Sequence, residues 1–219
     1  MGEATWAPTP ATPTMATLQK WVCGYVGFPD DDEALETALA GIRQAIAKIN
    51  TRDWNWAIVY EDMVSDATLV DYAVPSNFRK PYRLLAVDAD GLTKFRLAYV
   101  PWKSFLDEYQ EQTASGDPCV YTVANMREYG TVSLDCTPRA EWVARYPTLR
   151  IWYYRNVQND NQDGQPDWPG FATPFVQSWA EGYTADRYAV TKASAAYAKA
   201  ERHWHDMVRD DNNTETDWS

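Results

Sequence analysis

The sequence is poor in the residues from which most catalytic and metal centres are built. Its 219 residues include only three cysteines and two histidines. Cys23, Cys119 and Cys136 are widely spaced and form no CxxC pair. Neither a disulfide framework nor a structural zinc site is therefore indicated, and we expect a reducing, cytosolic setting.

Long apolar runs and an excess of positive charge are also lacking. No apolar stretch approaches the roughly 20 residues that span a bilayer, and no basic region followed by an apolar core opens the chain. Lys and Arg together number 20 against 31 Asp and Glu, a formal net charge of -11. We therefore expect no membrane segment and no tight binding of a phosphate backbone, although DNA can pass such a surface without sticking.

The chain contains no GxSxG sequence, phosphate-binding loop or dinucleotide fingerprint. Asn159, Asn161, Asp163 and Gly164 resemble the first half of a calcium-binding EF-hand loop, but Gly170 stands where that loop needs Glu. A polar turn is the favoured interpretation.

The remaining reactive side chains do not form a motif either. His203 and His205 flank Trp204 near the end of a predicted helix, where they point to different sides and complement the helix dipole. Neither Cys119 nor Cys136 has a histidine base nearby in the sequence. We expect no active site, no cofactor and no metal, and hence a protein that is not an enzyme.

Aromatic residues, by contrast, are abundant, with 11 Trp and 14 Tyr. Trp and Tyr are good strand formers and are enriched where proteins bind one another. Short runs rich in Val, Leu, Tyr and Trp, separated by turn residues, predict strands at 57–60, 69–74, 83–87, 94–100, 119–123, 131–136 and 149–155. Turns are predicted at 64–67 and 88–91, and the last strand is aromatic enough to be buried on both faces.

Helical patterns flank these strands. A short helix is predicted at 17–25, and a longer one follows the acidic run 30–33, with an apolar stripe of Leu35, Leu39, Ile42, Ile46 and Ile49. Another begins at Pro174 and is expected to be interrupted near Gly182, and a last helix is predicted at 185–209. Pro101-Trp102 opens a short helix within the strand-rich region.

The pattern predicts an α+β protein in which N- and C-terminal helices form a helical bundle and an antiparallel β-rich domain is inserted between them. The expected parts are an extended N-terminal arm at 1–16, the bundle at 17–53 and 170–209, the inserted domain at 54–157, a polar linker at 158–169 and an acidic, disordered C-terminal tail at 210–219.

Three phrases in the strand-rich region carry a resemblance. They are Tyr72-Ala73-Val74-Pro75-Ser76-Asn77-Phe78, Gly116-Asp117-Pro118-Cys119-Val120-Tyr121 and Leu149-Arg150-Ile151-Trp152-Tyr153-Tyr154. In these phrases the chain resembles the head-to-tail adaptor, or connector, proteins of tailed bacteriophages, of the tail tubular protein A type. Val74 and Asn77 depart mildly from the family pattern. The matching positions, which the resemblance implies to be structural, are Tyr72, Pro75, Phe78, Gly116, Pro118, Tyr121, Tyr153 and Tyr154.

The resemblance implies a structural subunit of a ring, commonly of twelve copies, that lies beneath the portal protein and joins the capsid to the tail. A tail, nozzle or tail-terminator protein would bind its other side, and DNA would pass through its channel. The location implied is the neck of the virion, after assembly in the host cytoplasm. We also hypothesise that the tail at 210–219 binds the portal through Asp210 and Asp211, with Trp218 as a buried anchor.

Two alternatives remain at this point. The chain is another virion protein, for tail completion or the baseplate, or it is a soluble carbohydrate- or peptide-binding module. In the second case an aromatic sheet face would bind the ligand. The residues of that face would be Trp102, Tyr121, Trp142, Trp152 and Tyr154.

Overall fold

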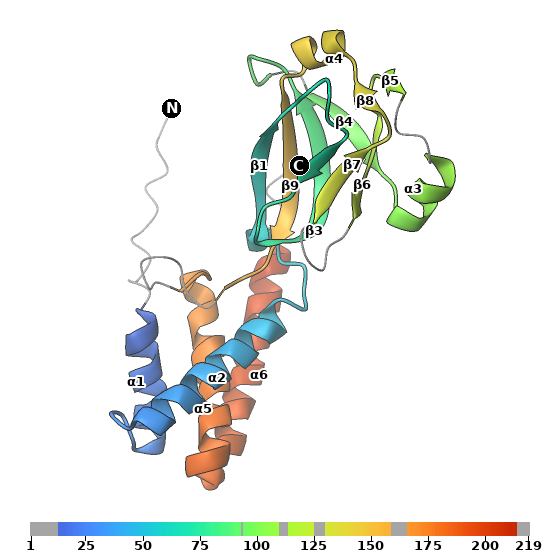
Figure 1. The fold of residues 1–219 in the computed structure, drawn as a ribbon. Coiled ribbons are helices and arrows are strands. Elements are labelled where there is room, and N and C mark those ends of the chain that lie inside the picture. Colours follow the sequence, from blue (N-terminus) through green and yellow to red (C-terminus); the bar gives the residue numbers. More distant parts are fainter. Residues whose placement is uncertain (1–12, 93, 110–113, 125–129, 159–165, 214–219) are drawn as a thin grey trace. The chain divides into compact units, whose positions relative to one another are not determined.

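The computed structural model describes residues 13–92, 94–109, 114–124, 130–158 and 166–213 (Figure 1). The chain is of the α+β class and divides into two compact units. A helical unit is drawn from residues 1–56 and 157–219, and a sheet unit from residues 57–156. Within the described residues, no helix combines the length and the apolar character needed to cross a membrane.

The helical unit is organised around one helix. Its helices are α1 (Met15–Val26), α2 (Asp32–Ile49), α5 (Thr173–Tyr188) and α6 (Val190–Asn213), with short 3-10 turns at η1 (Asn55–Ala57) and η2 (Gly170–Ala172). Helix α5 packs against each of α1, α2 and α6 (Figure 1). A Cβ at Gly41 of α2 would lie 3.0 Å from the backbone of Ala180, so α2 and α5 approach closely there.

The two N-terminal helices begin and end where local chemistry predicts. Thr14 caps α1, which ends at Gly27 with a φ of 96°, and Asp31 caps α2 by accepting from the Ala34 N–H at 2.8 Å. The helices predicted at 17–25 and after 30–33 are confirmed. The buried face of α2 differs from the predicted stripe, because Leu35 and Leu39 are only half-buried and small residues such as Ala34, Ala38 and Ala45 lie in the core.

Two predictions about the C-terminal helices are wrong. Helix α5 continues through Gly182 and ends at Tyr188, with Ala189 as its C-cap. Helix α6 extends to Asn213, so residues 210–213 are helical and do not belong to a disordered tail. Gly182 does not break α5 because it provides room for the ring of Tyr197 on α6, which lies 2.8 Å from where a Cβ would be.

The sheet unit is built on seven strands in the order β1-β9-β3-β4-β6-β7-β2 (Figure 1). All neighbours are antiparallel except β4 and β6. The strands are β1 (Ile58–Val64), β2 (Asp71–Ala73), β3 (Phe78–Val87), β4 (Lys94–Tyr99), β6 (Val120–Ala124), β7 (Thr131–Leu134) and β9 (Thr148–Arg155). A parallel pair, β5 (Ser115–Gly116) and β8 (Thr137–Pro138), and the short helices α3 (Trp102–Glu108) and α4 (Ala140–Arg145) complete the unit.

One face of the sheet encloses the core of this unit. Its buried residues come from β2, β3, β4, β6, β7 and β9, from α4 and from the C-cap of α4: Tyr72, Leu84, Ala86, Leu97, Tyr121, Val123, Val132, Leu134, Trp142, Tyr146, Leu149, Ile151 and Tyr153. Burial alternates along β9, where Leu149, Ile151 and Tyr153 are buried and the residues between them are half-buried. The prediction that this strand is buried on both faces is therefore wrong.

The two predicted turns have different outcomes. The turn at 88–91 is confirmed, because it joins β3 to its antiparallel partner β4 and Gly91 has a φ of 70°. The turn at 64–67 does not form a hairpin. Strand β1 pairs with β9, and β2 pairs with β7. Turn residues indicate where a strand ends, but they do not determine which other strand it pairs with.

We expect Gly182→Ala to lower the free energy of unfolding by about 1 kcal/mol or more, because the added methyl group displaces the ring of Tyr197. Gly24→Ala is the matched control in α1, where a Cβ meets nothing within 4 Å. It should stabilise the protein by about 0.5–1 kcal/mol through helix propensity. Urea unfolding measures both changes, and equal effects of the two substitutions would contradict the packing argument.

Candidate functional site

The residues that carry the resemblance take part in the architecture of the sheet unit. Tyr72 of β2 is buried, and its hydroxyl accepts from the Asp66 N–H at 3.2 Å and lies 3.3 Å from the carbonyl of Leu69. Burial raises the pKa of Tyr72. This side chain therefore fixes the segment before its own strand.

The end of the first phrase bonds directly to the third. The Asn77 Oδ1 accepts from the hydroxyl of Tyr153 at 2.9 Å, and the Asn77 carbonyl accepts from the Asn156 N–H at 2.7 Å. The rings of Phe78 and Tyr153 lie 5.3 Å apart. The turn is closed by the Phe78 N–H on the Pro75 carbonyl at 3.0 Å. These contacts hold the start of β3 against the end of β9.

The residues of the second phrase have a similar structural role. The Gly116 carbonyl accepts from the Arg139 N–H at 2.9 Å, and Pro118 and Tyr121 are buried. Burial raises the pKa of Tyr121 well above its usual range. Tyr154 differs from the buried tyrosines Tyr72, Tyr121 and Tyr153 because it is half-buried on the face of β9 opposite the core.

The three residues predicted to bind a partner do not share one environment. Asp210 is exposed and pairs with Arg209 at 3.5 Å. Asp211 is only 4% exposed, and its carboxylate accepts from the Asn55 N–H at 2.8 Å while its carbonyl accepts from the Asn55 Nδ2 at 3.1 Å. Trp218 lies outside the described residues. Asp211 thus holds the end of α6 to the start of η1 and is not an available contact residue.

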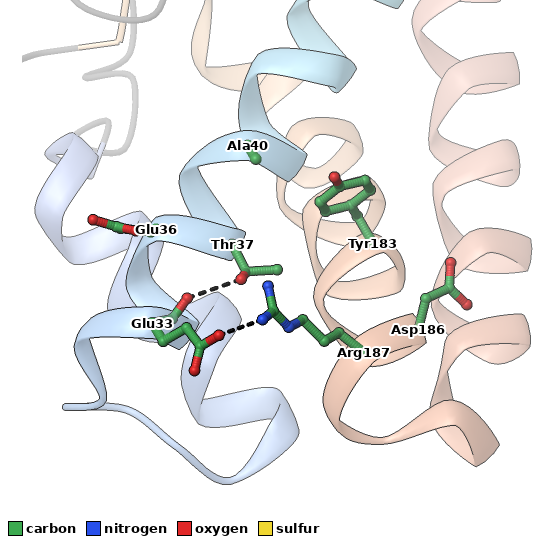
Figure 2. A pocket seen from close by; sticks show the side chains of 7 residues that line it. All are labelled: Glu33, Glu36, Thr37, Ala40, Tyr183, Asp186 and Arg187. Atoms are coloured by element: carbon green, nitrogen blue, oxygen red, sulfur yellow. Dashed lines mark hydrogen bonds and ion pairs between the residues drawn. The ribbon is translucent and has the colours of Figure 1, made fainter.

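An open groove of about 650 Å³ runs between α2 and α5 of the helical unit. Figure 2 shows the side chains that line it, which come from both helices: Glu33, Glu36, Thr37 and Ala40 from α2, and Tyr183, Asp186 and Arg187 from α5. Three carboxylates and one guanidinium give it a net negative charge. The spacing of the α2 residues places them along one side of that helix.

Two of the three carboxylates in the groove already have partners. Glu33 forms an ion pair with Arg187, and Asp186 accepts from the hydroxyl of Tyr197 at 2.9 Å. Burial and the neighbouring Asp186 raise the pKa of Tyr197 to about 12, so its proton is retained at neutral pH. Glu36 is exposed and reaches away from the Glu33 ion pair in Figure 2. In the described part of the chain, Glu36 has no hydrogen-bond or ion-pair partner.

The face of the sheet opposite the core carries aromatic rings and arginines. Tyr60 of β1 and Trp152 of β9 are register partners with rings 4.9 Å apart. Arg150 lies 4.6 Å over the Tyr60 ring and bonds to both oxygens of Asp62, at 2.6 and 2.7 Å. That hydrogen bonding lowers the pKa of Asp62, and it neutralises the charge of Arg150.

Arg83 of β3 lies on the same face without such a partner. Its guanidinium lies 4.6 Å over the ring of Trp152 and 5.6 Å from that of Tyr82. Its Nε is buried and makes no hydrogen bond, and no carboxylate in the described ranges pairs with it. We refer to Tyr60, Tyr82, Arg83 and Trp152 as the Arg83 face.

The alternative aromatic platform does not form as predicted. Tyr121 and Trp142 are buried in the core of the sheet unit, whereas Trp152 and Tyr154 lie on the opposite face of β9. Trp102 is 40% exposed on α3. The alternation of side chains across a strand separates these residues, so the five do not present one ligand surface.

Reactive side chains are not gathered into a centre in the described residues. Burial raises the pKa of the Cys119 thiol, and it raises the pKa of the Cys136 thiol to about 11. Both thiols are therefore protonated at neutral pH and weakly nucleophilic. His203 is half-buried, which lowers its pKa, while His205 is exposed. Across the described ranges, no group of three or more His, Cys, Asp or Glu side chains is placed to hold a metal ion. The EF-hand-like residues at 159–164 lie outside those ranges.

Comparison with known proteins identifies no family for this chain. No protein-family model matches the chain, and no curated protein is significantly similar to it in sequence.

Sequence reasoning missed both the groove and the Arg83 face. Glu33 and Glu36 lie at helical spacing and indicated one side of the groove. Its other side is formed by α5, about 150 residues later in the chain, so the sequence did not indicate that the two helices meet. The Arg83 face needed the pairing of β9 with both β1 and β3, which no local pattern reveals.

We expect Asp211→Ala to lower the free energy of unfolding by about 1–3 kcal/mol, because it leaves the Asn55 N–H without its acceptor. Asp210→Ala is the matched control one residue away, and it should change stability by less than about 0.5 kcal/mol because Asp210 is exposed. Urea unfolding followed by tryptophan fluorescence measures both. An unchanged stability in Asp211→Ala would show that this hydrogen bond does not hold α6 in place.

Proposed function

We propose that this protein is a structural head-to-tail adaptor of a tailed bacteriophage. In this proposal it forms a ring beneath the portal in the virion neck, joins the capsid to the tail and leaves a channel for DNA. The observation that carries the proposal is that all three phrases of the resemblance meet in one sheet unit, inserted between the two halves of a helical unit. In this proposal the helices α1, α2, α5 and α6 would form the helical bundle.

The chemistry of the described side chains favours a non-enzymatic role. The phrases that carry the resemblance support strand ends and the core, as in the bond between Tyr153 and Asn77. The thiols of Cys119 and Cys136 are protonated at neutral pH. A subunit of this kind acts by presenting surfaces to its neighbours, and Tyr, Trp and Arg are the residues that such surfaces favour.

The distribution of charge suits a conduit for DNA. The net charge is -11, and the helical unit holds nine Lys or Arg residues against eighteen Asp or Glu. A negative surface repels the phosphate backbone, so a channel lined by it lets DNA move without binding. The end of α6 limits the segment available to the portal: Asp211 is occupied within the fold, and Asp210 and Trp218 remain the proposed contacts.

We expect the purified protein, mixed with the portal ring from the same genome, to assemble into a ring of about twelve subunits, as measured by light scattering. This assembly buries surface only when matching faces meet, so it should not occur with an unrelated ring protein of similar size. A ring of six or three subunits would favour a tail-completion or baseplate protein. A chain that stays monomeric and ignores the portal contradicts the proposal.

Within this proposal, Trp218→Ala should weaken binding to the portal at least about tenfold, because a buried Trp is a common anchor of an interface. Trp21→Ala is the control, since Trp21 is 49% exposed on α1 and lies far from Trp218 in the sequence. Surface-immobilised portal gives both affinities. Equal affinities of the two variants would remove Trp218 from the portal contact and leave ring assembly to be judged by the preceding experiment.

A further inference from the structure

One ionised side chain in each unit combines two features: it has no ion-pair partner within the described residues, and it lies in one of the two candidate binding surfaces. Arg83 of the sheet unit stacks on aromatic rings and meets no carboxylate. Glu36 of the helical unit is exposed on the groove between α2 and α5 and meets no cation. Arg150, beside the Arg83 face, is neutralised by Asp62, and Glu33 in the groove is neutralised by Arg187. Other charges that are unpaired in the described part of the chain, such as Arg145 and Glu201, lie outside both surfaces, so Arg83 and Glu36 are the two charges that these surfaces offer to a second molecule.

The surroundings of Arg83 are those of a protein interface. Tyr60 is 53% exposed and Tyr82 is 48% exposed, and Arg83 lies with them beside Trp152. Tyr, Trp and Arg are the residues that contribute most to binding between proteins. The stacking of the guanidinium on Trp152 fixes its orientation before binding, which reduces the entropy lost when a partner is bound.

The charge of the two units determines which surface of a second copy fits. The helical unit has nine cationic side chains against eighteen acidic ones, whereas the sheet unit has eleven against thirteen. Two helical units in contact would repel each other. A contact between the nearly neutral sheet unit, with its displayed Arg83, and the acidic groove of another copy is attractive.

We propose that the Arg83 face of one copy docks onto the α2–α5 groove of the next, where Arg83 pairs with Glu36. This inference rests on the proposed function, because it names the surfaces through which the ring would form. A contact between two different surfaces leaves one free groove and one free Arg83 face at the ends of every assembly. Copies therefore continue to add head to tail until a ring closes.

The test is complementation between two charge-reversed chains. Arg83→Glu brings two carboxylates together, and Glu36→Arg brings two cations together, so each variant alone should need at least about tenfold more protein to assemble. A mixture of the two variants should assemble like the unmodified chain, because Glu at 83 in one meets Arg at 36 in the other and both kinds of contact are restored. Light scattering, with and without the portal ring, measures the assembled mass.

Matched controls separate this pairing from a general effect of charge. Arg145→Glu alters an arginine of α4 in the sheet unit that also lies over an aromatic ring, that of Tyr146 at 5.2 Å. Glu201→Arg alters an exposed residue of α6. Both should assemble like the unmodified chain. Glu36 is exposed, so Glu36→Arg should fold even where Arg83→Glu does not, and Arg83→Gln then takes the place of the latter and should weaken assembly.

The outcomes distinguish this inference from the proposed function. If the unmodified chain forms rings and the variants at 83 and 36 do so equally well, the inference is wrong and the adaptor proposal stands. If each variant fails and the mixture also fails, Arg83 and Glu36 do not pair with each other, and the inference is wrong again. If the unmodified chain never assembles, with or without the portal, both proposals fall.

Discussion

The pairing of β1 with β9 is the interaction on which the organisation of the chain depends. These strands are the first and last of the sheet unit, and their register places Ile58 opposite Tyr154. The two ends of a hundred-residue insertion are therefore neighbours on one ladder. The chain that leaves the helical unit returns close to where it left, so helices far apart in sequence can pack together.

The side chain of Asn50 holds the returning chain in the helical unit. Asn50, at the end of α2, donates through its Nδ2 to the Val157 carbonyl at 2.9 Å and accepts at its Oδ1 from the Val157 N–H at 2.8 Å. A side-chain amide carries both a donor and an acceptor, so the single side chain of Asn50 satisfies both backbone polar groups of Val157. The β1–β9 ladder and Asn50 together turn an insertion in the sequence into a separate unit in the fold.

The sequence alone was sufficient to predict structural features that depend on residues close together in the chain. The cap at Asp31 and the turn at Gly91 follow from side chains within a few residues of each other. Features that depend on contacts between residues far apart in the chain could not be predicted from the sequence. Strand β9 lies between β1 and β3, and Gly182 is needed for packing against Tyr197 rather than for ending a helix. From the sequence alone, a glycine within a helical pattern predicts a helix end, because the residue that packs against it in the fold is not known.

The same distinction applies to the candidate site. The sequence assigned Asp211 to a tail, yet its carboxylate is the acceptor for a backbone N–H some 150 residues away in the chain. Arg150 and Arg83 both lie in strands rich in aromatic residues, so the sequence does not distinguish them. The strand pairing does: Asp62 of β1 neutralises Arg150 of β9, whereas Arg83 of β3 contacts only aromatic rings in the described part of the chain. Whether a surface charge is available for binding is thus a property of the sheet register rather than of the residue type.

The difference in charge between the units is increased by where the cations are placed. Lys48, one of the nine cations of the helical unit, lies 4.3 Å over the ring of Trp179 and 5.1 Å over that of Trp204, and is half-buried. Its charge is directed into the packing of α2 against α5 and α6, where the rings stabilise it. The exterior of the helical unit is therefore more acidic than its composition suggests. The sheet unit uses the same interaction, since Arg83 is also half-buried and lies over the ring of Trp152. The helical unit has nine cationic side chains against eighteen acidic ones and the sheet unit eleven against thirteen, and this asymmetry favours contact between unlike units of successive copies over contact between two helical units.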